Sequence, residues 1–166
     1  MTPLYDTLRD VLAGKATELF ADYGVTCTPL DTDPPSSSLL CGILGFTGDQ
    51  LCGSVVIAAT VDAISRTNPI GDGPTRGWVA ELTNQLVGRF KNQLFRGGIE
   101  VAMSVPVVLT ATQLTPLPQA QAAPIKMQVA EGSVTIWLEI EATPGLMLSE
   151  PGADSEIAAE GESMMF

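Results

Sequence analysis

Two apolar segments separated by a short polar turn restrict the fold of this chain more than any other feature. Residues 39–46 and 51–58 are hydrophobic at nearly every position, and the stretch between them contains Gly48-Asp49. Glycine tolerates the positive φ of tight turns, so the pattern predicts a β-hairpin. Consecutive apolar positions are typical of strands covered on both faces, which we expect here. Three glycines inside the strands indicate close approach by a helix or another backbone: Gly42, Gly45 and Gly53.

Hydrophobic residues at the helical period predict two long helices and one short one. In residues 4–23 the apolar side chains recur about every 3.6 positions, and Gly24 is the expected stop. Residues 75–95 have the strongest helical pattern in the chain, and Gly97-Gly98 follows it. The short helix is expected at residues 61–67, with Thr60 as its N-cap. The apolar stripe of the strongest helix consists of Val79, Leu82, Leu86, Phe90 and Leu94.

The second half of the chain predicts further strands. Residues 99–114 are rich in Val and Thr but contain Pro106, so we expect two strands with a bend or bulge at that proline. Residues 125–142 alternate between polar and apolar around Glu131-Gly132, which predicts a second hairpin. Residues 28–38 are predicted to be a loop. The fold class expected from this order is α+β, an antiparallel sheet of about six strands with two long helices packed on it.

The length of the chain predicts one domain and a tail. The chain has 166 residues, which leaves no room for two domains of ordinary size. We expect the domain at residues 1–143 and an acidic, flexible tail at 144–166, which holds five of the 19 acidic residues. The longest uncharged stretch, residues 101–125, contains four prolines and therefore predicts no membrane span. With no apolar signal core near the start, we expect a cytoplasmic protein.

Composition excludes several classes of function. The chain has 8 basic and 19 acidic residues, and the net charge of −11 argues against nucleic acid and anionic membranes as partners. It has no histidine, which excludes Ser-His-Asp and Cys-His catalysis and histidine-ligated metals. Cys27, Cys41 and Cys52 form no CxxC pair, so we expect reduced, buried thiols and neither a zinc site nor another metal or cofactor site.

The polar face of the helix predicted at residues 75–95 carries the candidate site. Glu81 and Asn84 are three residues apart and project from adjacent turns, and Gly88 lies four residues further on. A mid-helix glycine costs about 1 kcal/mol relative to alanine, so it usually has a packing or access reason. We infer that another surface comes close beside Asn84. From the apolar stripe alone, however, Glu81 and Asn84 would be ordinary solvated residues.

Half of the basic residues of the chain lie on or beside this helix: Arg76, Arg89, Lys91 and Arg96. This local positive charge could meet the acidic rim of a partner despite the negative net charge. It could also serve solubility alone, and the sequence favours neither explanation.

Residues 80–88, AELTNQLVG, resemble the ExxNxxxG helix of the CheC/CheX family, phosphatases that dephosphorylate the response regulator CheY in bacterial chemotaxis. The family pattern continues with a downstream proline, and Pro106 stands 22 residues after Asn84. The segment GILGFTGDQLCGSVVIA also resembles the hairpin of the family, and the likeness extends over residues 4–142. The chain has a single ExxN motif, so it is more similar to CheX than to the two-site CheC.

This resemblance implies a CheC-like fold, a homodimer that joins sheets between subunits, and a phosphorylated CheY-type receiver domain as partner. Asn84 would position the water that attacks the aspartyl phosphate, and Glu81 would pair with a lysine of the receiver. Any Mg²⁺ would belong to the receiver. The remaining expected roles are partner binding by Gly77, Gly88, Arg89 and Lys91, and a structural role for Pro106.

One departure from the family pattern supports a second hypothesis. The family has Asp or Ser four residues before the glutamate, and this chain has Gly77 at that position. The alternative is therefore a non-catalytic module of the same fold that binds a receiver domain or a flagellar-switch component without hydrolysis.

Overall fold

Three helices and seven strands make up the part of the chain that the computed structural model describes, namely residues 3–32, 38–71, 75–114 and 123–149. The elements in chain order are α1 (Pro3–Asp22), β1 (Cys27–Pro29), β2 (Leu39–Thr47), β3 (Leu51–Thr60), α2 (Val61–Thr67), α3 (Thr75–Arg96), β4 (Ala102–Met103), β5 (Val107–Ala111), β6 (Ile125–Val129) and β7 (Gly132–Ala142). The structure confirms the predicted α+β class and the predicted helices, with ends that differ by one residue at most.

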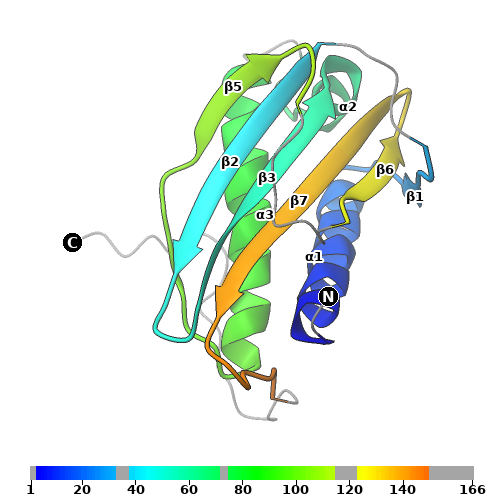
Figure 1. The fold of residues 1–166 in the computed structure, drawn as a ribbon. Helices are drawn as coiled ribbons and strands as arrows, with labels where there is room; N and C mark the ends of the chain where they lie inside the picture. Colours follow the sequence, from blue (N-terminus) through cyan, green and yellow to red (C-terminus); the bar gives the residue numbers. More distant parts are fainter. Residues whose placement is uncertain (1–2, 33–37, 72–74, 115–122, 150–166) are drawn as a thin grey trace.

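All seven strands form one antiparallel sheet (Figure 1). The strand order is β1-β6-β7-β3-β2, and β4 and β5 both pair with β2 beyond it. The predicted hairpin is confirmed, because β2 and β3 pair from Leu39↔Thr60 to Thr47↔Cys52. The second predicted hairpin is β6–β7, which closes at Val129↔Gly132. Pairing of β3 with β7 joins the two hairpins at the centre of the sheet.

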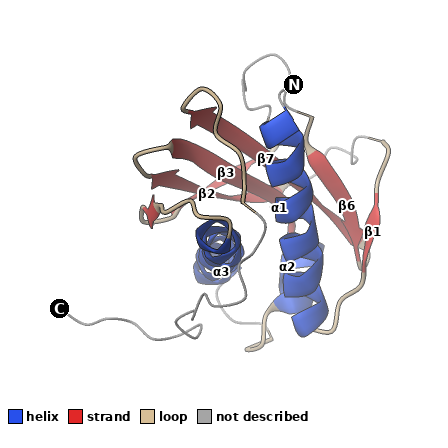
Figure 2. Ribbon diagram, turned by 90° about the horizontal axis from the view of Figure 1, so that it is seen from below, coloured by secondary structure: helices blue, strands red, loops and turns tan. Residues whose placement is uncertain are grey.

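Helices α1 and α3 lie on the same face of this sheet (Figure 2). No helix of the described residues lies on the opposite face, but Cys41, Ala58 and Thr135, which point to it, are buried, so coverage of β2 and β3 on both faces stays a prediction. Side chains alternate along a strand, and Ile43, Val56 and Trp137 point to this second face, where they are half-buried. An apolar run shows that both faces of a strand are hydrophobic, but it does not show what covers the second face.

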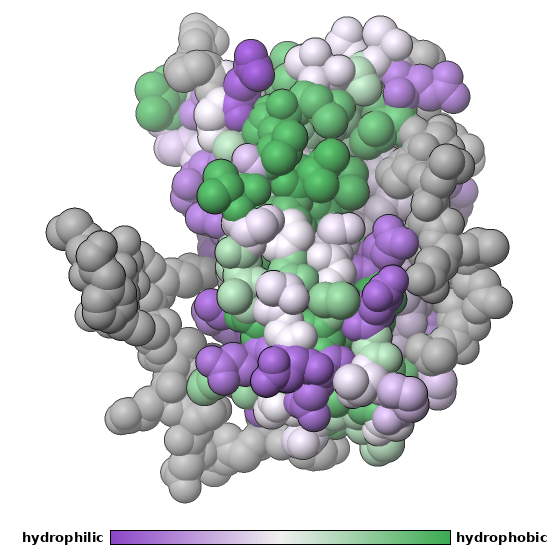
Figure 3. All heavy atoms as spheres, turned by 60° about the vertical axis from the view of Figure 1, so that its left-hand side comes forward, coloured by the Kyte–Doolittle hydropathy of each residue, from purple (hydrophilic) through white to green (hydrophobic). Residues whose placement is uncertain are grey.

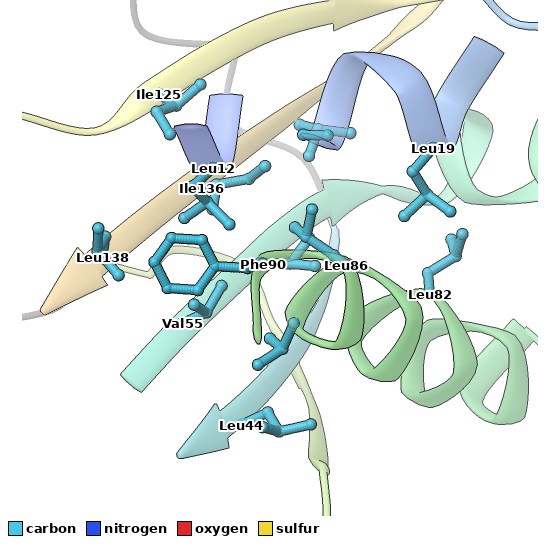
Figure 4. Packing of buried hydrophobic residues seen from close by; sticks show 14 of the residues in the cluster. Leu12, Leu19, Leu44, Val55, Leu82, Leu86, Phe90, Ile125, Ile136 and Leu138 are labelled. Atoms are coloured by element: carbon cyan, nitrogen blue, oxygen red, sulfur yellow. The ribbon is translucent and has the colours of Figure 1, made fainter. Parts of the chain in front are cut away.

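The core lies between the sheet and the two long helices (Figure 4). From α3, Leu82, Leu86 and Phe90 point toward α1 and the sheet, and Phe90 is fully buried. Burying a side chain of this size contributes roughly 1.5–3 kcal/mol. The stripe therefore determines which face of α3 is turned inward. The residues that form the core together with this apolar stripe include Leu12 and Leu19 of α1 and Val55, Ile136 and Leu138 of the sheet.

Helix α3 comes closest to the sheet at Gly42 of β2. A Cβ on Gly42 would collide with the Oγ1 atom of Thr83, and it would lie 3.0 Å from the Thr83 Cβ. Thr83 is completely buried, and its hydroxyl donates a 2.7 Å hydrogen bond to the Val79 carbonyl one turn earlier. Since Thr83 precedes Asn84, this contact holds the turn of α3 that carries the candidate site.

The local sequence pattern predicted one segment of the sheet correctly and missed another. Pro106 lies between β4 and β5, as predicted, and the interruption is a bulge, because one extra residue lies between the pairs Phe46↔Met103 and Ile43↔Val107. At this interruption the Ser104 hydroxyl accepts a 3.0 Å hydrogen bond from the Gly45 N–H. Strand β1 (Cys27–Pro29), in contrast, extends into residues 28–38, the segment predicted as a loop. It is three residues long and forms by pairing with β6, a contact that the local sequence does not reveal.

The residues that follow β7 pack back onto the fold up to residue 149. Leu148 lies against Gly97 at the end of α3, and the Ser149 N–H donates a 3.0 Å hydrogen bond to the Gly97 carbonyl. The packed part of the chain therefore extends beyond the predicted boundary at residue 143. Residues 150–166, which include most of the predicted acidic tail, lie outside the described residues.

Substitution of Gly42 tests the close approach of α3 to the sheet. Gly42→Ala should lower the free energy of unfolding by about 1–3 kcal/mol, because the added methyl group meets the buried Thr83 side chain. Urea denaturation measures the change. Gly14→Ala on α1 is the control, since a Cβ there meets nothing within 4 Å, and it should stabilise by about 0.5–1 kcal/mol. Equal stability of Gly42→Ala and the wild type would contradict this packing.

Candidate functional site on helix α3

The outward face of α3 brings together five of the predicted site residues, whereas Arg89 lies on another side of the helix and Pro106 lies between β4 and β5 of the sheet. Successive residues of an α-helix are turned by about 100°, so Gly77, Glu81, Asn84, Gly88 and Lys91 share one face. Glu81 and Asn84 are both exposed, and Gly88 and Lys91 are half-buried. The carboxylate and the carboxamide therefore project from the molecule on adjacent turns, where a second protein can reach them.

Glu81 also contacts a residue that the sequence did not single out. The Gln85 side-chain amide donates a 2.8 Å hydrogen bond from Nε2 to the Glu81 Oε1 atom. The Tyr23 hydroxyl, beyond the end of α1, donates a 2.8 Å hydrogen bond to the Gln85 Oε1 atom. Glu81 is thus connected through Gln85 to a residue that lies 62 positions from Gln85 in the sequence.

Tyr23 is also held in place by its contact with Trp78. Its ring packs edge-on against Trp78 in the first turn of α3, with ring centroids 5.0 Å apart and planes at 87°. The Trp78 Nε1–H donates a 2.9 Å hydrogen bond to the hydroxyl of Thr67 in α2, which is buried. These contacts tie the end of α1, the start of α3 and the end of α2 together beside the site.

The two cations assigned to partner binding have different surroundings. Arg89 donates a 2.7 Å hydrogen bond from Nη2 to Asp22 at the end of α1, and its side chain is 16% exposed. Much of its charge is therefore compensated within the chain. Lys91 is half-buried on the face of Asn84. The binding roles predicted for Arg89 and Lys91 stay predictions.

The glycines of the site face leave space beside the polar groups. A Cβ added at Gly77 or Gly88 would meet nothing within 4 Å. Gly88 is therefore not required by packing inside the chain. The inference that another surface approaches beside Asn84 remains a prediction, and the open space is compatible with it.

An exposed aromatic ring on the same face was missed by the sequence analysis. Phe95 lies near the end of α3 and is 48% exposed, whereas its neighbour Leu94 is fully buried. The signal was present, because Phe95 follows Asn84 by 11 residues, about three helical turns, and therefore falls on the face of Asn84 and not on the apolar stripe. The site face therefore ends in a hydrophobic side chain.

Two of the three cysteines, Cys27 and Cys41, have the surroundings of unreactive thiols. All three are free; Cys41 is buried, and Cys27 and Cys52 are half-buried. Burial raises the pKa of the Cys27 thiol to about 11 and also raises the pKa of Cys41. A thiol with a raised pKa is protonated at neutral pH and is a weak nucleophile.

Other parts of the described chain do not share residues with the site face. A cavity of about 550 Å³ lies between α1 and the β1–β6 edge of the sheet, and its lining includes Arg9, Cys27 and Lys126 but none of the predicted site residues. Within the described ranges, no three Asp, Glu or Cys side chains come together as possible metal ligands. In the same ranges, no helix combines the length and apolarity needed to cross a bilayer.

Residues 40–129, more than half of the chain, match the family described as "Chemotaxis phosphatase CheX". The chain belongs to this family. The family match includes the β2–β3 hairpin, the whole of α3 and Pro106. None of the curated proteins compared with the chain matches it.

Solved structures of similar fold come from chemotaxis proteins. CheX from Vibrio vulnificus is 21% identical with a TM-score of 0.67, and the match covers 81% of this chain and 96% of that one. A CheC-like superfamily protein from Shewanella sp. PV-4 is 20% identical with a TM-score of 0.66, covering 86% and 100%. CheX from Borrelia burgdorferi, in a complex with CheY, BeF₃ and Mg²⁺, is 14% identical with a TM-score of 0.55, covering 79% and 96%. The predicted CheC-like fold is confirmed.

Gly88→Ala separates the stability of α3 from the access to its outer face. Because the added methyl group meets nothing within 4 Å and alanine favours the helix, the free energy of unfolding should rise by about 0.5–1 kcal/mol. If a partner surface uses the open space, the affinity for that partner should fall at the same time. Thermal unfolding and a binding titration measure the two effects, and Gly14→Ala is the control that stabilises without a change in affinity. Unchanged affinity in Gly88→Ala would contradict the close approach.

Proposed function

We propose that this protein is a phosphatase that removes the phosphoryl group from the aspartate of a CheY-type receiver domain. The observation that carries the proposal is the joint exposure of Glu81 and Asn84 on one packed helix. Membership of the CheX family supports it. We also propose that the protein acts in the cytoplasm and uses no cofactor of its own, since Mg²⁺ would belong to the receiver.

The chemistry needs little from this chain beyond exact positioning of a water molecule. Hydrolysis of an aspartyl phosphate proceeds by in-line attack of water, and the receiver supplies the groups that neutralise the phosphoryl oxygens. The Asn84 carboxamide both donates and accepts hydrogen bonds, so it can orient the attacking water without a change in protonation. Glu81 would form an ion pair with the lysine of the receiver, which sets the orientation of docking.

Asn84 can position the water and Glu81 can direct docking only if α3 holds both side chains rigidly. A misplacement of about 1 Å can cost roughly 100-fold in rate. Thr83 is buried against Gly42 directly before Asn84, and Leu82 and Leu86 are buried on either side of it. The backbone that carries the carboxamide is therefore supported by the core of the domain and not by a loop.

The departure at Gly77 motivates the alternative of a binding module without hydrolysis. Gly77 is exposed in the first turn of α3, a turn that has no acidic residue. An Asp or Ser at this position would add a polar group beside Glu81, and Gly77 lacks that group. Receiver binding without phosphate release in the wild type would favour this alternative.

Asn84→Ala tests the proposed enzyme. The rate constant kcat for release of phosphate from the receiver should fall about 100-fold, because the water loses its orienting group. Stability should change by less than about 0.5 kcal/mol, since Asn84 is exposed. Phosphate release is followed on the organism's own phosphorylated receivers, with Asn92→Ala on the same helix as control. A rate equal to that of the wild type would exclude Asn84 as the positioning residue.

We further propose that the protein forms a homodimer through the β5 side of its sheet. Figure 3 shows hydrophobic residues gathered on the side that carries this edge. Val107, the first residue of β5, is 60% exposed and is opposite Ile43 in the register with β2, and Val105, two residues before the strand, is 83% exposed. A sheet edge with apolar side chains needs a cover, and a second copy supplies one.

Val107→Glu should convert the dimer into a monomer, because it places a charge in the proposed interface. Size-exclusion chromatography with light scattering measures the mass directly. Ile70→Glu is the matched control, since Ile70 is 78% exposed but lies in the turn after α2, and this variant should stay dimeric. A monomeric wild type, or a dimeric Val107→Glu variant, would contradict the proposed interface.

A further inference from the structure

We propose that Gln85 and Tyr23 are positioning residues that hold the Glu81 carboxylate ready for docking. This inference rests on the proposed function of Glu81 as the group that pairs with the receiver. It adds two residues that lie outside the ExxN motif. The Tyr23 hydroxyl donates a hydrogen bond to the Gln85 side-chain carbonyl, and the Gln85 NH₂ group donates one to the Glu81 Oε1 atom. Each hydrogen bond is 2.8 Å long.

The chemistry of the three groups determines the direction of these hydrogen bonds. An ionised carboxylate only accepts hydrogen bonds, so the Gln85 NH₂ group must face Glu81. The Gln85 carbonyl oxygen is then turned toward Tyr23, whose hydroxyl can donate to it. Tyr23 therefore orients the amide of Gln85, and the amide orients the carboxylate.

The benefit for docking is a smaller loss of side-chain freedom. A free glutamate on a helix surface samples several rotamers, and fixing a long side chain in one of them costs conformational entropy. Hydrogen bonding to Gln85 restricts Glu81 before the partner arrives. One hydrogen bond leaves most acceptor sites of the carboxylate available, because its two oxygens can accept about four. Glu81 can therefore be held by Gln85 and still pair with a cation of the partner.

Tyr23 can serve as the fixed end because it is itself immobilised. Its ring contacts Trp78, which donates to the Thr67 hydroxyl, and Thr67 in turn donates a 2.9 Å hydrogen bond to the Ile64 carbonyl. Thr67 and Ile64 are both buried in α2. The position of an exposed carboxylate on α3 is thus set by the packing of three helices.

The contacts of Gln85 and Tyr23 lead to Glu81, so the proposal predicts an effect on docking and not on the chemical step. Gln85→Leu keeps the size of the side chain and removes its polar group, and Tyr23→Phe keeps the ring against Trp78 and removes only the hydroxyl. Each variant should raise KM for the phosphorylated receiver about three- to ten-fold with kcat unchanged. Asn84→Ala, in contrast, should lower kcat.

A double-mutant cycle distinguishes positioning from a merely structural role. If Gln85 and Tyr23 act through Glu81, their substitution should have no further effect on receiver affinity in a Glu81→Ala background. The affinity is measured with a receiver activated by beryllofluoride and Mg²⁺, which needs no turnover. The same loss of affinity in both backgrounds would overturn the proposal.

A second measurement does not depend on activity. Carbon-13 relaxation of the Glu81 side chain should show faster, larger motion in Tyr23→Phe and Gln85→Leu than in the wild type. Tyr5→Phe is the matched control on α1, because the Tyr5 hydroxyl bonds to the Leu138 carbonyl, and Gln93→Leu is the matched control on α3. Neither control should change the motion of Glu81.

The two measurements separate failure of this inference from failure of the proposed function. If no receiver is dephosphorylated or bound by the wild type, the proposed function is wrong, and the relaxation data alone decide whether Gln85 and Tyr23 position Glu81. If dephosphorylation occurs but both positioning variants retain the KM and the Glu81 dynamics of the wild type, the inference is wrong and the function stands.

Discussion

The packing of α3 against β2 at Gly42 is the constraint on which both the core and the candidate site depend. Only a residue without a Cβ lets Thr83 lie directly on the strand. Protein interiors are close-packed, so a shift of the helix at this point would also displace the buried stripe around Leu86 and Phe90. Because the inward face is held so firmly, the outward face is equally well defined, and Asn84 projects from the turn that the contact supports.

The shape of the site suits a macromolecular partner better than a small molecule. Glu81 and Asn84 project from the convex surface of a helix, and the 550 Å³ cavity near the β1–β6 edge is lined by other residues. Small ligands are usually bound in concave sites, whereas an exposed helix face can be inserted into a pocket of another protein. Arg89 lies outside this face, and Asp22 compensates its charge within the chain.

Much of the fold was accessible from the sequence because its signals are local. The 3.6-residue period of α3, the turn between β2 and β3 and the strand interruption at Pro106 are each encoded in a short stretch, and all three are confirmed. Strand β1 was missed because it owes its existence to pairing with β6, a partner about 100 residues away. The helices cover one face of the sheet only, which hydrophobicity along β2 and β3 could not reveal.

The candidate site likewise has one part that local sequence determines and one part that depends on tertiary contacts. The helical period by itself determined that Glu81 and Asn84 share a face and that this face is opposite the apolar stripe, since both follow from the geometry of one helix. Only the tertiary structure decided that Tyr23 would reach Gln85 across 62 residues and thereby orient Glu81. That contact depends on α1 and α3 packing side by side on the sheet, and no local pattern of residues specifies such a meeting.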